Sequence, residues 1–198
     1  MSGASAGRPR YEPGAVLTPA NLVTVARIAA TPVFVVMVVG GEPAWLTFWV
    51  GFVIGITDFL DGYLARRQGS TRSGAFLDPL ADKVLVLGGM VALVANGQFH
   101  WVPVAVIMVR EAAISVYRSR VGRQGISVPA TRAAKWKTFV QLWAIGFALI
   151  PPIAQGAHWI ATTALWVAVV LTIWTGFTYL WGARRLAGVS TSEGDDVP

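Results

Sequence analysis

Six apolar segments, each close to the ~20 residues that a helix needs to cross a bilayer, make up most of this chain. They cover residues 19–39, 44–65, 79–96, 101–119, 134–154 and 159–183. With 198 residues, 55% of them hydrophobic, and a mean hydropathy of +0.58, the chain is more apolar than one soluble core requires. The sequence therefore predicts an all-α integral membrane protein: six transmembrane helices within 18–186, after an N-terminal segment at 1–17 and before a disordered tail at 187–198.

Positive charge is distributed unevenly among the connections between these segments. The connections after the first, third and fifth segments contain no Lys or Arg, whereas the N-terminal segment, the other connections and the C-terminal end hold nearly all of them. Lys and Arg accumulate on the cytoplasmic side of membrane proteins, so we expect both termini to be cytoplasmic. The net charge of +6 then reflects topology and anionic lipid, and not nucleic acid, because the polar segments are too short for a recognition domain.

Four aspartates lie within residues 58–82, although only 13% of the chain is charged. Asp58 and Asp61 are three residues apart and Asp78 and Asp82 four apart, and either spacing puts two carboxylates on one helix face. Unpaired carboxylates are costly inside a membrane, which favours a shared metal site. Because the chain has no Cys and its two His lie far from the aspartates in sequence, oxygen ligands favour two Mg²⁺ or Mn²⁺ ions.

The alternative interpretation of these acids is a structural salt-bridge network with Arg66, Arg67 and Lys83. The positions of the four aspartates relative to the expected helix ends lead to a further prediction. We expect Thr18 with Pro19 to cap and open the first helix, and Asp78 with Pro79 to do the same for the third. All four carboxylates would then reach the cytoplasmic boundary, in a polar cavity that opens to the cytoplasm.

The spacing of small and charged residues around the aspartates forms a motif. It reads Asp58, two residues, Asp61-Gly62, two residues, Ala65-Arg66, seven residues, Gly74, three residues, Asp78, three residues, Asp82. This motif resembles the signature of the CDP-alcohol phosphotransferase family. The resemblance implies a homodimeric integral membrane enzyme that moves a phosphodiester-linked group from a CDP-linked donor to an alcohol and releases CMP.

The resemblance also implies roles for individual residues. Asp58, Asp61 and Asp78 correspond to metal ligands, and Asp82 to the general base for the acceptor hydroxyl, which can also contact a metal. The residues that correspond to the nucleotide site are Gly62, Ala65, Arg66 and Gly74. The two glycines have a plainer interpretation as close-packing positions between membrane helices.

The choice of acceptor depends on the second half of the chain. Arg110 and Glu111 lie near the middle of the fourth segment, where neither can face lipid at low cost. Arg118 follows Arg110 by about two turns, and Lys135 and Lys137 begin the fifth segment from the same side. We expect Arg110, Arg118, Lys135 and Lys137 to bind an acceptor phosphate.

Four stretches, at 19–28, 74–83, 109–115 and 125–141, resemble one branch of the family, the bacterial phosphatidylglycerophosphate synthases. The prediction is transfer of phosphatidyl from CDP-diacylglycerol to glycerol 3-phosphate in the bacterial cytoplasmic (inner) membrane, with membrane lipid and a second copy of the chain as partners. Several alternatives stay open. The acceptor can be phosphatidylglycerol or inositol phosphate, or the protein can be a divalent-cation transporter or a catalytically silent scaffold. The partner of Arg27 in the first segment also stays open: Arg27 can approach the acidic site or pair with Glu111.

Overall fold

The computed structural model describes residues 18–68, 72–123 and 132–192. Within these ranges, nothing is described for the side chains of residues 20, 58–68, 72–76, 78–79, 118, 121–123, 132–135 and 179–192. The described chain forms only helices: α1 (Pro19–Gly40), α2 (Trp45–Gln68), α3 (Arg72–Ala95), α4 (Trp101–Arg123), α5 (Arg132–Leu149), α6 (Pro151–Gly156) and α7 (Trp159–Ser192). The prediction of an all-α protein is confirmed.

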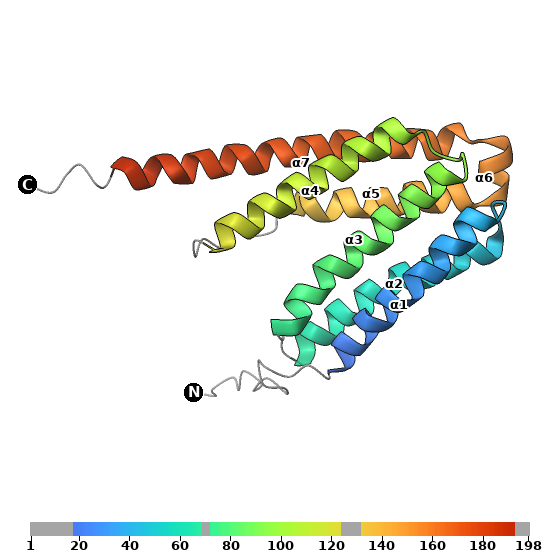
Figure 1. Cartoon of the computed structure of the whole chain (residues 1–198), viewed down its shortest axis with the longest axis horizontal. Helices are drawn as coiled ribbons and strands as arrows, with labels where there is room; N and C mark the ends of the chain where they lie inside the picture. Colours follow the sequence, from blue (N-terminus) through green and yellow to red (C-terminus); the bar gives the residue numbers. More distant parts are fainter. Residues whose placement is uncertain (1–17, 69–71, 124–131, 193–198) are drawn as a thin grey trace, which may run out of the picture.

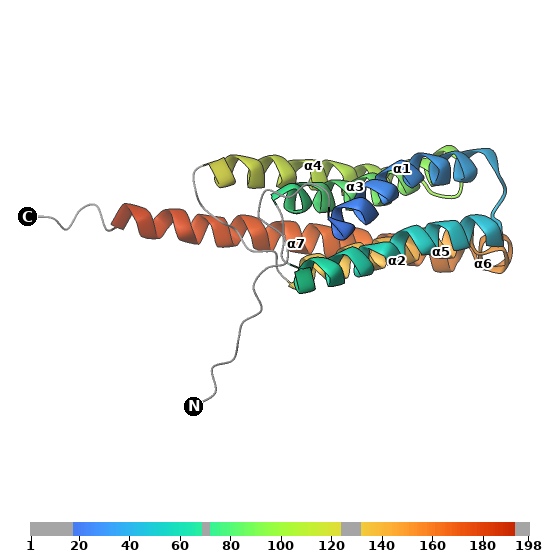
Figure 2. The ribbon, with the colours of Figure 1, turned by 90° about the horizontal axis from the view of Figure 1, so that it is seen from below.

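The six long helices match the six predicted segments, and the short α6 is an addition in the last connection. Helix α7 ends at Ser192, so it includes residues 187–192 of the stretch predicted as a tail. The long helices form two layers of three, with α1, α3 and α4 over α2, α5 and α7 (Figure 2). The most extensive helix contacts join α1 to α2 and α3, and α7 to α5 and α4.

The predicted helix starts have different outcomes. Thr18 caps α1 as expected: its side chain accepts a hydrogen bond of 3.2 Å from the backbone N–H of Asn21, and Pro19 is the first helical residue. The prediction for α3 is wrong, because this helix begins at Arg72 and Asp78 lies inside it. Pro79 removes one helical hydrogen bond, and Ala75 and Leu77 favour continuing the helix through it.

The interior of the bundle changes character along its length. At the end where α4 begins, the fully buried side chains are apolar and include Phe34, Met90, Leu93, Ile107 and Leu165. Toward the other end, α1, α4, α5 and α7 bury polar groups, which include Thr24, Arg27, Glu111, Lys137, Gln141, Thr172 and Thr175. The bundle therefore has an apolar interior at one end and a polar interior at the other.

The outer surface is apolar along several helices, unlike that of a soluble bundle. Large exposed side chains include Val33 and Val36 on α1 and Val170, Ile173 and Trp174 on α7. Among the described residues, two stretches are long and apolar enough to cross a membrane by length and composition, Asn21–Gly40 and Trp159–Thr178. Polar groups inside and apolar groups outside are what a lipid solvent favours.

Candidate active site

The four aspartates lie on two consecutive helices that meet at one end of the molecule. Helix α2 ends at Gln68 and α3 begins at Arg72, close to the end where α1 begins (Figure 1). At about 1.5 Å per residue, Asp61 lies about 10 Å and Asp78 about 9 Å from the neighbouring helix ends. Asp58 and Asp82 both lie about 15 Å from those ends. The four aspartates therefore occupy two levels along the helices, each with one residue from α2 and one from α3.

Asp82 is the aspartate of this set whose side chain the structure describes. Its carboxylate lies 3.6 Å from Nη1 of Arg27, and the Arg27 side chain is 0% exposed whereas that of Asp82 is 42% exposed. Nε of Arg27 donates to the Thr57 hydroxyl at 3.3 Å, and that hydroxyl donates to the carbonyl of Ile54 at 2.6 Å. Arg27 thus links α1 to α2 and α3, and of its two expected partners it contacts the acidic site.

The side chains of Asp58, Asp61 and Asp78 lie outside the described part of the structure, so the metal site stays a prediction. The same holds for the residues expected at the nucleotide. Gly62, Ala65 and Arg66 are on α2 and Gly74 is on α3, within the last three turns of α2 and the first turn of α3. The backbone therefore places them on the two helices that bear the aspartates.

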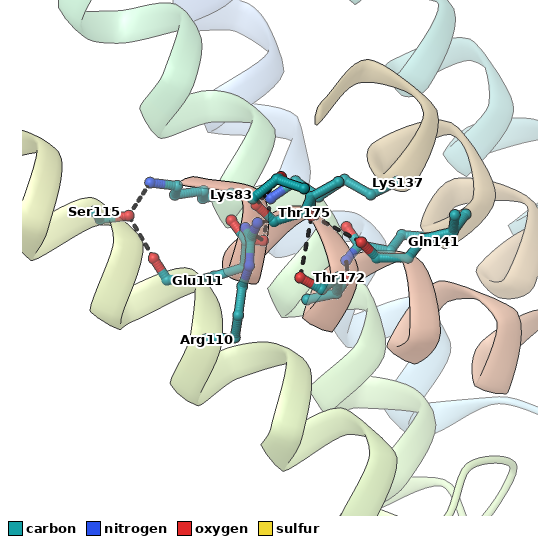
Figure 3. A network of polar contacts seen from close by, with 10 residues as sticks. Lys83, Arg110, Glu111, Ser115, Lys137, Gln141, Thr172 and Thr175 are labelled. Atoms are coloured by element: carbon teal, nitrogen blue, oxygen red, sulfur yellow. Dashed lines mark hydrogen bonds and ion pairs between the residues drawn. The ribbon is translucent and has the colours of Figure 1, made fainter. Parts of the chain in front are cut away.

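A second polar group lies between α4, α5 and α7, and we call its three charged members, Arg110, Glu111 and Lys137, the Glu111 cluster. Oε1 of Glu111 accepts from Nη1 of Arg110 at 2.8 Å and also from Nζ of Lys137 (Figure 3). The three side chains are only 10–11% exposed. One buried carboxylate therefore holds two cations from different helices.

Further polar contacts connect this cluster to α3 and α7. Lys83 of α3 donates to the Ser115 hydroxyl, which in turn donates to the Glu111 carbonyl at 2.6 Å. On the other side, Nη2 of Arg110 donates to the hydroxyl of Thr175 at 2.7 Å (Figure 3). Because Lys83 follows Asp82 directly in sequence, the chain of contacts extends from the aspartate helix to α7.

The predicted acceptor residues are therefore brought together in part. Arg110 and Lys137 share Glu111, while the side chains of Arg118 on α4 and Lys135 on α5 lie outside the described part. Sequence reasoning missed the α7 residues Thr172 and Thr175. The sequence does contain two threonines three residues apart in this apolar segment. Because threonine is common in membrane helices as a packing residue, this spacing alone does not indicate a contact with a charged group.

The charge of the assembled group suits an anion. The buried Arg110 and Lys137 supply two positive charges against the single negative charge of Glu111, and the half-buried Lys83 adds a third beside Ser115. A buried group with excess positive charge is costly without a partner, and a phosphate group offers acceptors for several N–H donors at once. The arrangement can hold a phosphorylated ligand near the aspartate helices.

The bundle has an apolar exterior and buried charged groups at one end. This combination is typical of a membrane protein with a polar reaction or binding site. The sequence model of the CDP-alcohol phosphatidyltransferase family matches residues 17–174, and the chain belongs to this family. The resemblance inferred from the aspartate motif is thereby confirmed.

Named relatives agree with this assignment. The chain is 36% identical over 193 residues to a "Probable phosphatidylglycerophosphate synthase" of Mycobacterium tuberculosis. This match covers 94% of this chain and 89% of the relative. It is 36% and 37% identical to proteins of Haemophilus influenzae and Pectobacterium atrosepticum that are named CDP-diacylglycerol--glycerol-3-phosphate 3-phosphatidyltransferase. Those matches cover 82% and 83% of this chain and 91% and 94% of the relatives.

Proposed function

We propose that this protein transfers the phosphatidyl group from CDP-diacylglycerol to glycerol 3-phosphate and releases CMP. The observation that carries the proposal is the similarity, over 82–94% of this chain, to relatives named for this reaction in three bacterial species. The Glu111 cluster supports the acceptor, because its excess of positive charge matches a phosphorylated alcohol better than serine, choline or free inositol.

The apolar exterior supports a lipid environment and a lipid donor. We expect all six long helices to cross the bacterial inner membrane, with both termini and the polar end of the bundle on the cytoplasmic side. An apolar cavity of about 180 Å³ lies between α1, α2, α3 and α5, lined by residues that include Phe52, Gly55 and Ile56. Since Gly55 and Ile56 precede Asp58 by less than one turn, we expect part of a donor acyl chain to occupy this cavity, close to the expected metal site.

The four aspartates fit Mg²⁺ or Mn²⁺, since they offer only oxygen ligands and stand at matching positions along two helices. Asp58, Asp61, Asp78 and Asp82 would hold two such ions. When bound, the ions would neutralise charge on the pyrophosphate of the donor. Gly62 and Gly74 would leave room for the nucleotide against the helix backbone, and Ala65 and Arg66 would complete that side.

In the reaction, the Asp82 carboxylate would accept the proton of the acceptor hydroxyl. The acceptor oxygen then forms a bond to the phosphorus of the phosphatidyl group, and the bond from that phosphorus to the CMP oxygen breaks, with the electron pair leaving on CMP. Arg27 would hold the Asp82 carboxylate in place through their 3.6 Å contact. Arg110, Arg118, Lys135 and Lys137 would orient the phosphate of the acceptor. We expect the working unit to be a homodimer.

The test is CMP release by the purified protein in detergent with Mg²⁺ and CDP-diacylglycerol. Glycerol 3-phosphate, phosphatidylglycerol, inositol phosphate, inositol and serine are compared as acceptors. Release with glycerol 3-phosphate alone is the expected result. Release with another acceptor would keep the chemistry and replace the substrate. Metal uptake into sealed vesicles without any CMP release would refute the proposal in favour of a transporter.

A further inference from the structure

Helix α7 contains no recognisable motif and none of the residues predicted for the site, yet it contacts Arg110 at two consecutive positions. Nη2 of Arg110 donates to the Thr175 hydroxyl at 2.7 Å. At Gly176, the position that a Cβ would take lies 3.1 Å from Nε and 3.5 Å from Cγ of Arg110. The arginine side chain therefore lies directly against the backbone of α7.

We propose that Thr175 and Gly176 are positioning residues for the acceptor phosphate, acting through Arg110. The proposal rests on the proposed function, because it assigns Arg110 to the phosphate of glycerol 3-phosphate. The two residues do different things: Thr175 supplies a hydrogen-bond acceptor, and Gly176 supplies the space in which the side chain lies.

The Thr175 hydroxyl is itself held in place by the helix. It lies 2.8 Å from the Leu171 carbonyl and 3.1 Å from that of Thr172, so its proton points to the backbone of α7 and its oxygen is left to accept from Arg110. The acceptor for the guanidinium is thus set by the helix and not by a freely rotating hydroxyl. Glu111 and Thr175 together accept from two of the three guanidinium nitrogens, Nη1 and Nη2.

The third nitrogen indicates that this arrangement serves more than stability. Nε of Arg110 is buried, and no described residue accepts a hydrogen bond from it. Buried polar groups in proteins are nearly always paired, and leaving one unpaired is unfavourable. An anion that reaches Arg110 would supply the acceptor that Nε lacks among the described residues.

The tested variants are Thr175→Val, which keeps the side-chain shape without the hydroxyl, and Gly176→Ala, which places a methyl group 3.1 Å from Nε. Thr175→Ser restores the hydroxyl. Matched controls are Thr178→Val, where the hydroxyl bonds to the Thr175 carbonyl at 3.0 Å, and Gly40→Ala, where an added Cβ meets nothing within 4 Å.

CMP release is measured with each substrate varied in turn. We expect both α7 variants to raise KM for glycerol 3-phosphate about fivefold to tenfold, equivalent to about 1 to 1.4 kcal/mol, with KM for CDP-diacylglycerol and kcat within about twofold. Thr175→Ser and the two controls should stay near the original protein. Equal changes in both KM values, or failure of Thr175→Ser to restore KM, would show a merely structural role and overturn the proposal.

Binding without turnover separates this proposal from the proposed function. Glycerol 3-phosphate is titrated calorimetrically into the protein with EDTA, and glycerol serves as the ligand without phosphate. We expect Kd to rise about fivefold to tenfold in Thr175→Val and Gly176→Ala, and glycerol not to bind. Binding by the original protein without CMP release would refute the proposed reaction alone. No binding, or an unchanged Kd in both variants, would refute the role of α7.

Discussion

Replacing Glu111 by Gln tests whether one carboxylate holds the cations of the polar interior. Gln keeps the size of the side chain and one carbonyl oxygen, but it removes the negative charge shared by Arg110 and Lys137. Removing one partner from a buried ion pair costs about 3–5 kcal/mol. Because the amide oxygen can still accept one hydrogen bond, we expect a loss near the lower end, about 3 kcal/mol.

The loss is measured by unfolding the purified protein in mixed detergent–SDS micelles and following fluorescence from its nine tryptophans. A loss of about 3 kcal/mol corresponds to a fall in Tm of about 6–12 °C for a chain of this length. The matched control is Glu42→Gln, because Glu42 is exposed in the connection after α1, and it should change stability by less than about 0.5 kcal/mol.

A double variant makes the test specific to the cluster. Glu111→Gln with Lys137→Met removes one anion and one cation, so the net charge of the cluster stays at +1, carried by Arg110. We expect it to recover at least about half of the loss, since replacing both members of a buried pair costs much less than breaking it. A loss below about 0.5 kcal/mol for Glu111→Gln, or additive losses in the double variant, would refute the reasoning.

Three further predictions follow from the site and the packing. Asp82→Asn should lower CMP release about 10²–10⁴-fold while CDP-diacylglycerol binding changes much less; equal loss of both would make Asp82 mainly a metal ligand. EDTA should abolish CMP release and excess Mg²⁺ should restore it, whereas activity that survives EDTA would contradict the metal site. Gly51→Ala should lower the free energy of unfolding by about 1–3 kcal/mol in the micelle unfolding assay, because its Cβ would lie 2.6 Å from Cε2 of the buried Phe34. Gly40→Ala is the control, and equal stability of the two variants would contradict this packing contact.

Much of the fold was predictable because its signals are local. Each long helix overlaps one of the six apolar segments predicted from the sequence, and Thr18 caps α1 as its sequence indicates. The error at Asp78 has the same local origin: a polar residue before proline is a common helix start, but here the helix begins at Arg72 and continues through Pro79. One missing hydrogen bond does not outweigh residues on both sides that favour helix.

The candidate site was predictable only in the part that lies within one stretch of chain. The aspartate motif spans two consecutive helices, so its spacing alone identifies the family and places the acids at one end of the bundle. The partners of the charged residues were not predictable in this way. Sequence left Arg27 with two possible partners, and the packing of α1 against α3 brings it to Asp82.

By itself, the sequence determined the helices, the family and the clustering of carboxylates, because periodicity, capping and motif spacing are properties of neighbouring residues. The tertiary structure decided that Glu111 serves both Arg110 and Lys137, and that α7 holds Arg110 through Thr175. The Glu111–Lys137 and Arg110–Thr175 contacts join residues 26 and 65 positions apart in sequence. Such pairs form only where whole helices pack together, and the cost of burying an unpaired charge then selects the partners.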